Sequence, residues 1–300
     1  MTGDRPRHVS VMAGDVLALV EPAPERVLLD LTVGAGGHAE AFLLASAPTG
    51  SVVGVDRDAS ALELTRERLL PFGPRVRLLH GDFVTALRQL AQEGLRPDAI
   101  LMDLGLSSMQ IDDAERGFSL REDARLDMRM DARQAQGAQE LLAGIGEAEL
   151  ARLLRELADE PAAERIARAI VARRRTRPFR TTGDLRGVVE EALGRRGGKV
   201  HPATRTFQAL RMAVNDELGQ LREALPLALQ LLPPGGRLAV ISFHSGEDRL
   251  VKDAFARAAR EGHRLLTRRA IAPGREEQRA NRRSRSAHLR ALAKGGPITS

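Results

Sequence analysis

The chain has 300 residues, a length that fits one large or two smaller domains with a substantial apolar core. Hydrophobic residues make up 43% and charged residues 29% of the sequence, a balance that excludes wholesale disorder. The absence of cysteine excludes a disulfide framework, a thiolate metal site and a cysteine nucleophile.

The sequence contains no stretch typical of a secretion signal or a membrane span. The first seven residues lead into no long apolar segment. No run of about 18 or more apolar residues occurs anywhere in the chain. We therefore predict a soluble, cytoplasmic protein that does not bind membranes.

Positive charge is concentrated in two stretches. The net charge is +6, from 46 Lys and Arg against 40 Asp and Glu, and only three of the cations are lysines. Residues 165–180 contain seven arginines and no acid, and residues 264–294 contain nine arginines and one lysine against two glutamates. Because arginine forks pair with phosphate oxygens, these stretches favour nucleic-acid contact, although a solvated surface would have the same composition.

Short apolar runs in the first third of the chain predict buried parallel strands. The runs cover residues 27–31, 51–56, 76–80 and 99–103. Helical stretches lie between them, one from about Ala39 and another over residues 59–70. This alternation indicates right-handed βαβ units and a doubly wound α/β fold.

The alternation stops after residue 103, and helical periodicity replaces it. Apolar residues at helical spacing follow over residues 150–170, and Thr181 with Asp184 forms a capping-box pattern. Residues 207–225 are predicted to form one long amphipathic helix.

Strand character returns at residues 237–243, with further extended pieces near 263–270 and 286–293. We therefore predict an α/β domain over residues 1–112 and 206–300. An all-helical insertion over residues 113–205 interrupts this domain. The insertion begins after the fourth strand, at the edge of the sheet where α/β folds bind ligands.

A glycine-rich turn after the first strand indicates a cofactor site. At Gly36 and Gly37 the backbone can approach a ligand closely, and the helix amides behind them favour an anion. Asp56 closes the second strand, where a carboxylate can accept from both hydroxyls of an adenosine ribose. Asp30 lies just before the turn, where methyltransferases often have an acid that faces the amino-acid end of the cofactor, so it favours S-adenosylmethionine over NAD. The alternative is a tight turn that binds no ligand. No second His or acid stands at ligand spacing from His38, so we predict no metal site.

From residue 103 onward the sequence resembles one family closely. Asp103-Leu104-Gly105-Leu106-Ser107-Ser108-Met109-Gln110 is similar to a block of the bacterial ribosomal RNA small-subunit methyltransferase H family, formerly the MraW group. Further similar blocks occupy residues 112–119, 126–131, 201–211, 214–218, 241–245 and 281–287. They follow the family's order, and the resemblance extends from His8 to about Arg290.

The resemblance implies a class I S-adenosylmethionine-dependent methyltransferase, in which the helical insertion recognises the substrate. The implied activity is N4-methylation of a cytidine in 16S ribosomal RNA, at the decoding centre of the small subunit. Matched residue by residue, the family's cofactor contacts fall on Gly36, Gly37, His38, Asp56, Phe83, Asp103 and Gln110.

The chemistry of this reaction points to Asp103 as the candidate catalytic residue. The exocyclic amine of cytosine is a poor nucleophile because its lone pair is delocalised into the ring, so positioning supplies most of the catalysis. Asp103 ends the fourth strand and would bind the cofactor, orient the amine, or do both. Phe118 is a candidate to stack on the base, with core packing as the alternative.

Further polar residues are candidates for contact with RNA. His201, Asn215 and His244 lie in dense polar blocks, where catalytic, RNA-contacting and structural roles are all open. Two arginine groups would straddle a phosphate backbone while one cytosine is turned into the site, namely Arg173, Arg174 and Arg175, and Arg282, Arg283 and Arg285.

Three other functions compete with this prediction. The glycine turn and Asp56 alone would also suit an NAD-dependent oxidoreductase, and the arginine-rich stretches would suit a non-catalytic RNA-binding or assembly factor. Methylation of a small molecule is disfavoured, because such a substrate would need neither the insertion nor the basic tail.

Overall fold

The computed structural model describes residues 10–194 and 201–296. Within these ranges, only the backbone of Ser108 and Asp112 is described. The expectation for the first seven residues therefore concerns residues outside these ranges. The chain divides into two compact units, unit 1 (Met1–Gly105 with Leu218–Ser300) and unit 2 (Leu106–Glu217). Unit 2 begins earlier and ends later than the predicted insertion, because Leu106 and Phe207 pack into its apolar core.

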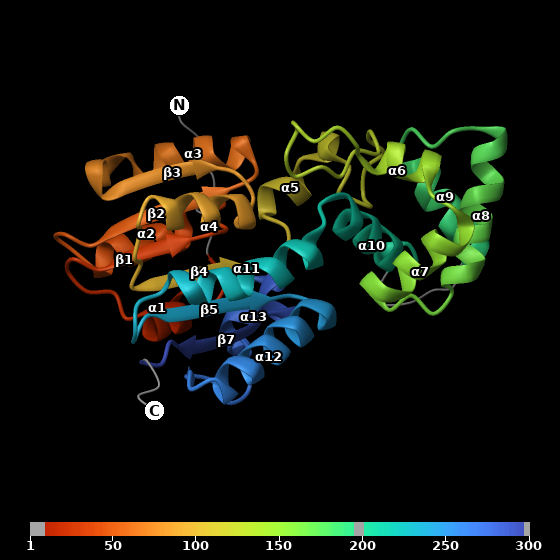
Figure 1. Ribbon diagram of the computed structural model, residues 1–300. Coiled ribbons are helices and arrows are strands. Elements are labelled where there is room, and N and C mark those ends of the chain that lie inside the picture. The colour runs from red at the N-terminus through yellow and green to blue at the C-terminus, as the bar shows by residue number, and fades with distance from the viewer. Residues whose placement is uncertain (1–9, 195–200, 297–300) are drawn as a thin grey trace. The chain divides into compact units, whose positions relative to one another are not determined.

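Unit 1 is built on a seven-stranded sheet with the order β3-β2-β1-β4-β5-β7-β6 (Figure 1). The strands are β1 (Val27–Asp30), β2 (Ser51–Asp56), β3 (Val76–His80), β4 (Ala99–Asp103), β5 (Arg237–Ser242), β6 (Arg264–Leu265) and β7 (His288–Ala293). Strands β1 to β5 pair in parallel, and β7 is antiparallel to β5 and β6. The predicted doubly wound, mostly parallel sheet is thus confirmed.

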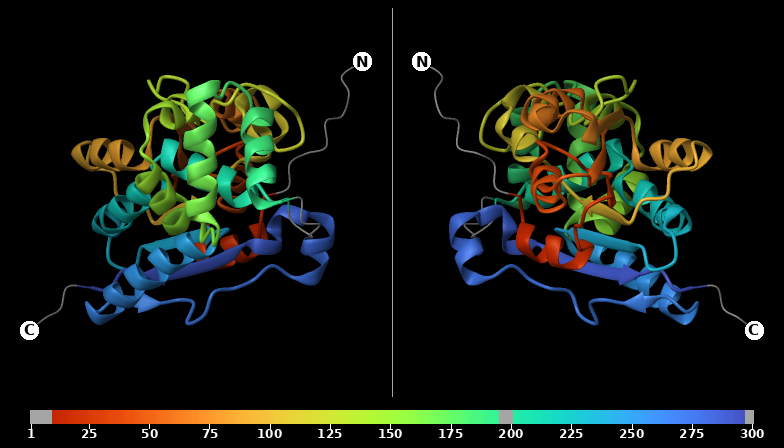
Figure 2. Two further views of the ribbon diagram at one scale, coloured as in Figure 1. Left: turned by 90° about the vertical axis from the view of Figure 1, so that its right-hand side faces the viewer. Right: turned by 90° about the vertical axis from the view of Figure 1, so that its left-hand side faces the viewer.

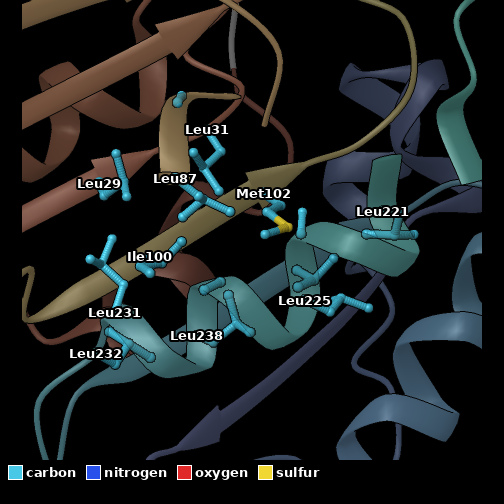
Figure 3. Packing of buried hydrophobic residues seen from close by; sticks show 14 of the residues in the cluster. Leu29, Leu31, Leu87, Ile100, Met102, Leu221, Leu225, Leu231, Leu232 and Leu238 are labelled. Carbon is cyan, nitrogen blue, oxygen red and sulfur yellow. The ribbon is translucent and has the colours of Figure 1, made fainter. Parts of the chain in front are cut away.

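Both faces of the sheet are buried under helices, which explains why its strands are almost continuously apolar. In β4, Ile100 and Met102 point to one face and Leu101 to the other, as the two-residue period of a strand requires. One face packs against α4 (Phe83–Gln92), α11 (Glu217–Leu231) and α12 (Ser245–Arg260). The other face packs against α1 (Ala13–Val20), α2 (Gly37–Ala45) and α3 (Ala59–Leu69). Figure 3 shows Leu221 and Leu225 of α11 in the first of these layers.

The C-terminal part of unit 1 follows one border of the sheet. The short helices η1 (Leu70–Arg75), α13 (Arg275–Ala280) and η3 (Arg282–Ser286) complete the unit. Strand β6 is the edge strand at this border, and Figure 2 shows the C-terminal part of the chain in blue. None of the helices in residues 10–194 and 201–296 has the length and apolar character needed to cross a membrane.

Unit 2 is helical, as predicted. Its helices are α5 (Ser108–Asp112), η2 (Ala114–Arg116), α6 (Ala138–Gly144), α7 (Glu147–Ala158), α8 (Ala163–Thr176), α9 (Thr182–Leu193) and α10 (Thr204–Val214). The apolar stripes of α7 and α8 meet in one core through residues such as Leu150, Leu154 and Ile166. The capping box between Thr181 and Asp184 is present at the start of α9.

The single long helix predicted over residues 207–225 is wrong, because the structure has two helices there. Helix α10 ends at Val214, and α11 begins at Glu217. Between them Asp216 adopts a left-handed conformation with φ of 46°. The side chain of Asn215 forms hydrogen bonds with the backbone of another segment: it donates to the carbonyl oxygen of Met128 and accepts from the N–H of Met130. The apolar periodicity continues across this break, so the sequence pattern alone did not reveal it.

Candidate cofactor and catalytic site

Three carboxylates stand at one edge of the sheet in unit 1. Asp30, Asp56 and Asp103 are the last residues of β1, β2 and β4. These strands are neighbours and run parallel, so their carboxyl ends lie side by side. Open α/β sheets bind their ligands at this edge.

The turn between β1 and α2 has a backbone that favours glycine. Gly34 and Gly36 have φ of 52° and 78°, which side chains rarely adopt. An added Cβ at Gly37 would lie 2.1 Å from the hydroxyl of Ser10. The turn is closed by the N–H of Gly34, which donates to Oδ2 of Asp56 at 2.9 Å. The glycines are therefore required by the turn and by the segment packed on it.

Asp56 supports this turn as well as offering acceptors to a ligand. Its Oδ1 accepts from the N–H of Asp58 at 2.9 Å, while Oδ2 is bonded to Gly34. Burial raises the pKa of Asp56 to about 6, against the opposing effect of these backbone hydrogen bonds. Each carboxylate oxygen keeps a second lone pair that can accept from a hydroxyl.

His38 lies beside the carboxylate of Asp103. It stands in the first turn of α2 with its side chain only 7% exposed, and its Nε2 is 3.4 Å from Oδ2 of Asp103. This is an ion-pair distance without the alignment of a hydrogen bond. Burial alone would lower the pKa of His38, but Asp103, followed by Asp30 and Glu277, outweighs burial and raises it.

Thr32 connects the acids of β1 and β4. Its hydroxyl accepts from the N–H of Asp103 at 2.6 Å and lies 3.4 Å from Oδ1 of Asp30, to which it donates. The N–H of Thr32 also donates to Oδ1 of Asp30, at 3.1 Å. Sequence reasoning missed Thr32, although an acid followed two residues later by threonine is a pattern of side-chain-stabilised turns.

Two buried carboxylate oxygens at this edge lack hydrogen-bond partners among the described residues. Oδ2 of Asp30 and Oδ1 of Asp103 accept no hydrogen bond from any residue that the structure describes. Asp30 is only 1% exposed, and its burial raises its pKa to about 6, with His38 opposing that rise. Buried polar atoms in proteins are nearly always satisfied, so these two oxygens point to a ligand.

Phe83 and Gln110, also predicted to contact the cofactor, have different settings. Phe83 begins α4 and is half-buried, with the guanidinium of Arg57 5.5 Å from the centre of its ring. Gln110 belongs to unit 2, where its Oε1 accepts from the N–H of Ser107 at 3.1 Å in the capping box of α5. The cofactor contact of Gln110 therefore stays a prediction.

Asn215 and His201 have partners within unit 2 that favour structural roles. The side-chain amide of Asn215 donates to the carbonyl oxygens of Met128 and Arg211, both at 2.8 Å, and the residue is only 2% exposed. Nε2 of His201 lies 2.9 Å from Oε1 of Glu190. Their predicted contacts with RNA stay predictions.

His244 has a structural role in unit 1. It caps α12, because its Nδ1 accepts from the N–H of Glu247 at 3.3 Å. Its Nε2 lies 3.2 Å from Oε1 of the same glutamate, and the N–H of Phe243 donates to the other carboxylate oxygen at 2.9 Å. These contacts favour helix capping, and a catalytic or RNA-contacting role of His244 stays a prediction.

Phe118 packs in the core of unit 2. It is 9% exposed within that core, and the guanidinium of Arg116 lies 5.9 Å from its ring centre. The structure thus favours the core-packing alternative, and stacking of Phe118 on a base stays a prediction.

The three arginines at the end of α8 have unequal surroundings. Arg174 donates to the carbonyl oxygens of Leu142 at 2.7 Å and Ile145 at 2.6 Å, where α6 ends. Arg173 donates to the carbonyl oxygen of Arg177 and is 3.5 Å from Asp184. Arg175 is exposed. Of the three, Arg175 is therefore the best placed for a phosphate.

The C-terminal arginines of unit 1 form an exposed group, which we call the basic segment. Its members are the exposed residues Arg264, Arg268, Arg269, Arg275, Arg279, Arg282, Arg283 and Arg285. Helix α13 also carries Glu277, whose Oε1 accepts from the N–H of Met12 at 2.6 Å and whose charge acts on His38. Sequence reasoning missed Glu277, because its partner is 265 residues away.

Among the described residues, no group of three or more acidic, histidine or cysteine side chains is arranged to hold a metal ion.

Comparison with known proteins identifies relatives along almost the full chain. Residues 5–295 match the family described as MraW methylase family. "Ribosomal RNA small subunit methyltransferase H" of Heliobacterium modesticaldum is 47% identical over 309 residues, covering 96% of this chain and 98% of the relative. The protein of that name from Syntrophotalea carbinolica is 46% identical over 311 residues, covering 97% and 99%. The solved structure of an rRNA methylase from Streptococcus thermophilus has a TM-score of 0.46 and 13% identity, covering 99% of this chain and 100% of that one.

A family match over nearly the whole chain, with relatives above 45% identity, settles the family. The glycine turn and the acids that end β1, β2 and β4 are thus parts of a methylase. The chain belongs to the MraW methylase family and is an S-adenosylmethionine-dependent methyltransferase.

Proposed function

We propose that this chain methylates N4 of a cytidine in the 16S ribosomal RNA of the small subunit. The observation that carries the proposal is the pair of buried carboxylate oxygens, on Asp30 and Asp103, that have no partner among the described residues. They stand beside the glycine turn, where a cationic cofactor and an amine would both find acceptors. The relatives' shared name, which specifies small-subunit ribosomal RNA, supports the class of substrate.

The residues present fit S-adenosylmethionine. Oδ2 of Asp30 suits the ammonium of the cofactor's amino-acid end, and the carboxylate of Asp56 suits the two ribose hydroxyls. The half-buried ring of Phe83 suits a flat heterocycle. When bound, the cofactor supplies an electrophilic methyl group on a positively charged sulfur. The excess of acids around His38 favours such a cation at this edge.

Asp103 is the group that would act on the amine. Its free Oδ1 can accept a hydrogen bond from the amine and so favour the pyramidal form that attacks. Thr32 holds the backbone of Asp103 in place through the 2.6 Å hydrogen bond. A fixed acceptor at the end of a rigid strand supplies the positioning that a weak nucleophile needs.

Recognition of the RNA would come from exposed cations. We assign phosphate contacts to Arg175 of unit 2 and to the basic segment of unit 1, with Arg282, Arg283 and Arg285 among its members. Unit 2 would be the substrate-recognition domain predicted from the sequence. Action on ribosomal particles would place the protein in the cytoplasm.

Membership of the methylase family removes the NAD-dependent oxidoreductase alternative. It also argues against a non-catalytic RNA-binding or assembly factor, because the family and its relatives are named as methylating enzymes. Methylation of a small molecule is not supported by the exposed basic segment, which such a substrate would leave unused.

The direct test is methyl transfer to ribosomal particles. The protein is incubated with labelled S-adenosylmethionine and either small or large subunits that lack the modification, and the RNA is digested to nucleosides. We expect N4-methylcytidine from the small subunit only. Asp103→Asn should lower single-turnover transfer by about tenfold or more, whereas Glu63→Gln, at an exposed position on α3, should not. Label in another nucleoside, or in the large subunit, would overturn the proposal.

A further inference from the structure

The two oxygens of the Asp103 carboxylate have different environments. Oδ2 lies 3.4 Å from Nε2 of His38, whereas Oδ1 is buried and has no partner among the described residues. The backbone of the same residue is held by Thr32 at 2.6 Å. The carboxylate is therefore restrained on one side and available on the other.

Carboxylates from three separate elements act electrostatically on His38. Asp103 ends β4, Asp30 ends β1, and Glu277 comes from α13. Burial lowers the pKa of His38, but these three acids together outweigh burial and raise it.

This inference rests on the proposed function: we propose that His38 is a positioning residue for the transfer, whose ring holds Oδ2 of Asp103 and leaves Oδ1 directed at the cytosine amine. The lone pair of the amine nitrogen forms the new nitrogen–carbon bond, and the pair of the broken carbon–sulfur bond stays on sulfur. The proton that the nitrogen then loses goes to Oδ1 of Asp103. His38 keeps its own proton throughout this step.

The long contact between His38 and Asp103 is compatible with this role. Hydrogen bonds of catalytic groups are often loose without substrate and shorten when the reactants are bound. A ring that only filled space beside the turn would not need three acids acting on it. The role assigned here also differs from cofactor binding, because it acts through the position of the Asp103 carboxylate.

The first measurement needs no substrate. The imidazole proton resonances of His38 are titrated by NMR in the wild-type protein and in Asp103→Asn. Because the carboxylate raises the pKa of His38, D103N should lower it. The exposed His288 is the internal control and should titrate identically in both proteins. An unchanged His38 titration would overturn the proposed coupling, whatever the activity.

The second measurement is the pH dependence of single-turnover transfer at saturating cofactor, for the wild type, His38→Gln and His38→Ala. Both variants lose the charge, and H38Q retains a donor for Oδ2. We expect H38A to be slower than H38Q and about tenfold or more below wild type. In both variants the pH profile of transfer should differ from that of the wild type, because the raised pKa of His38 no longer contributes a titrating charge beside Oδ2 of Asp103. His288→Gln should match wild type.

The cofactor dissociation constant and the melting temperature are measured for the same variants. Equal pH profiles in wild type, H38Q and H38A would overturn the inference, even if the variants bound cofactor weakly or were less stable. A wild-type enzyme that transfers no methyl group to small subunits would instead overturn the proposed function. The two failures are thus distinguishable.

Discussion

At the scale of single residues, the site contains a carboxylate, that of Asp30, whose charged form is destabilised by burial. Asp30 is buried, and one of its oxygens has no partner among the described residues. Such a group lowers stability but provides a ready acceptor for a cationic ligand. Sites of this kind commonly exchange stability for function.

Asp30→Asn should therefore stabilise the protein in the absence of cofactor, and only at higher pH. Because burial raises the pKa of Asp30 from 3.8 to about 6, the folded state binds a proton more tightly than the unfolded chain, and stability falls as pH rises from about 4 to about 6. We expect D30N to raise the free energy of unfolding by about 1–3 kcal/mol at pH 8 and by little at pH 4. Urea unfolding at the two pH values measures this. An equal gain at both would mean that the charge of Asp30 is not its source.

Asp56→Ala should weaken both the cofactor complex and the fold. The loss of charge-assisted bonds to the ribose should weaken S-adenosylmethionine binding by about 1.5–3 kcal/mol. The N–H groups of Gly34 and Asp58 also lose their acceptor, which should lower stability by roughly 1–3 kcal/mol. Calorimetric titration and urea unfolding measure the two effects, with Glu63→Ala as the surface control. An unchanged dissociation constant would remove Asp56 from the cofactor site.

At the scale of elements, two neighbouring arginines of helix α8 have different surroundings, although the sequence does not distinguish them. Arg174 and Arg175 are adjacent and both lie in the last turn. Arg174 satisfies two carbonyl oxygens where α6 ends, whereas Arg175 is exposed. Helix ends leave carbonyl groups without partners, so the first of these contacts is structural.

The single variants should accordingly differ. Arg174→Ala should destabilise unit 2 by about 1–3 kcal/mol, because two carbonyl groups lose a charged donor. Arg175→Ala should change stability by no more than about 0.5 kcal/mol and should raise the apparent KM for ribosomal particles. Urea unfolding and initial rates are measured on both variants. A loss of stability in R175A as large as that in R174A would contradict this division.

At the scale of the whole molecule, the proposed RNA binding uses exposed charge distributed along the C-terminal part of unit 1. The basic segment follows β5 in sequence and includes residues on β6, α13 and η3. Glu277 ties α13 to Met12 of the N-terminal part. The arginines of this segment are therefore carried by elements anchored to the cofactor-binding unit.

Replacing Arg282, Arg283 and Arg285 together by Ala should weaken the interaction with small subunits and reduce its dependence on salt. Each phosphate contact releases counterions, so each lost contact should reduce the logarithmic salt slope by about 0.7–0.9. Cofactor affinity should not change. A second triple variant, with Ala at the exposed Arg66, Arg88 and Arg222 of α3, α4 and α11, is the matched control. Initial rates against particle concentration at two salt levels make the comparison, and parallel slopes for the first variant and wild type would contradict phosphate contact.

Sequence alone determined the sheet, the helical unit and the acids at the strand ends, because these depend on local periodicity and on where strands stop. Strands β2, β3 and β4 have the predicted bounds. Only the tertiary structure decided what depends on contacts between distant segments. Contacts between distant segments interrupt the helix at Asn215 and bring His38 beside Asp103. They also give Arg174 a structural role while its neighbour Arg175 stays exposed. The partners in these contacts lie tens of residues apart in the sequence. Two side chains of the same type therefore differ in role, because one contacts a distant segment of the fold and the other remains exposed to a ligand.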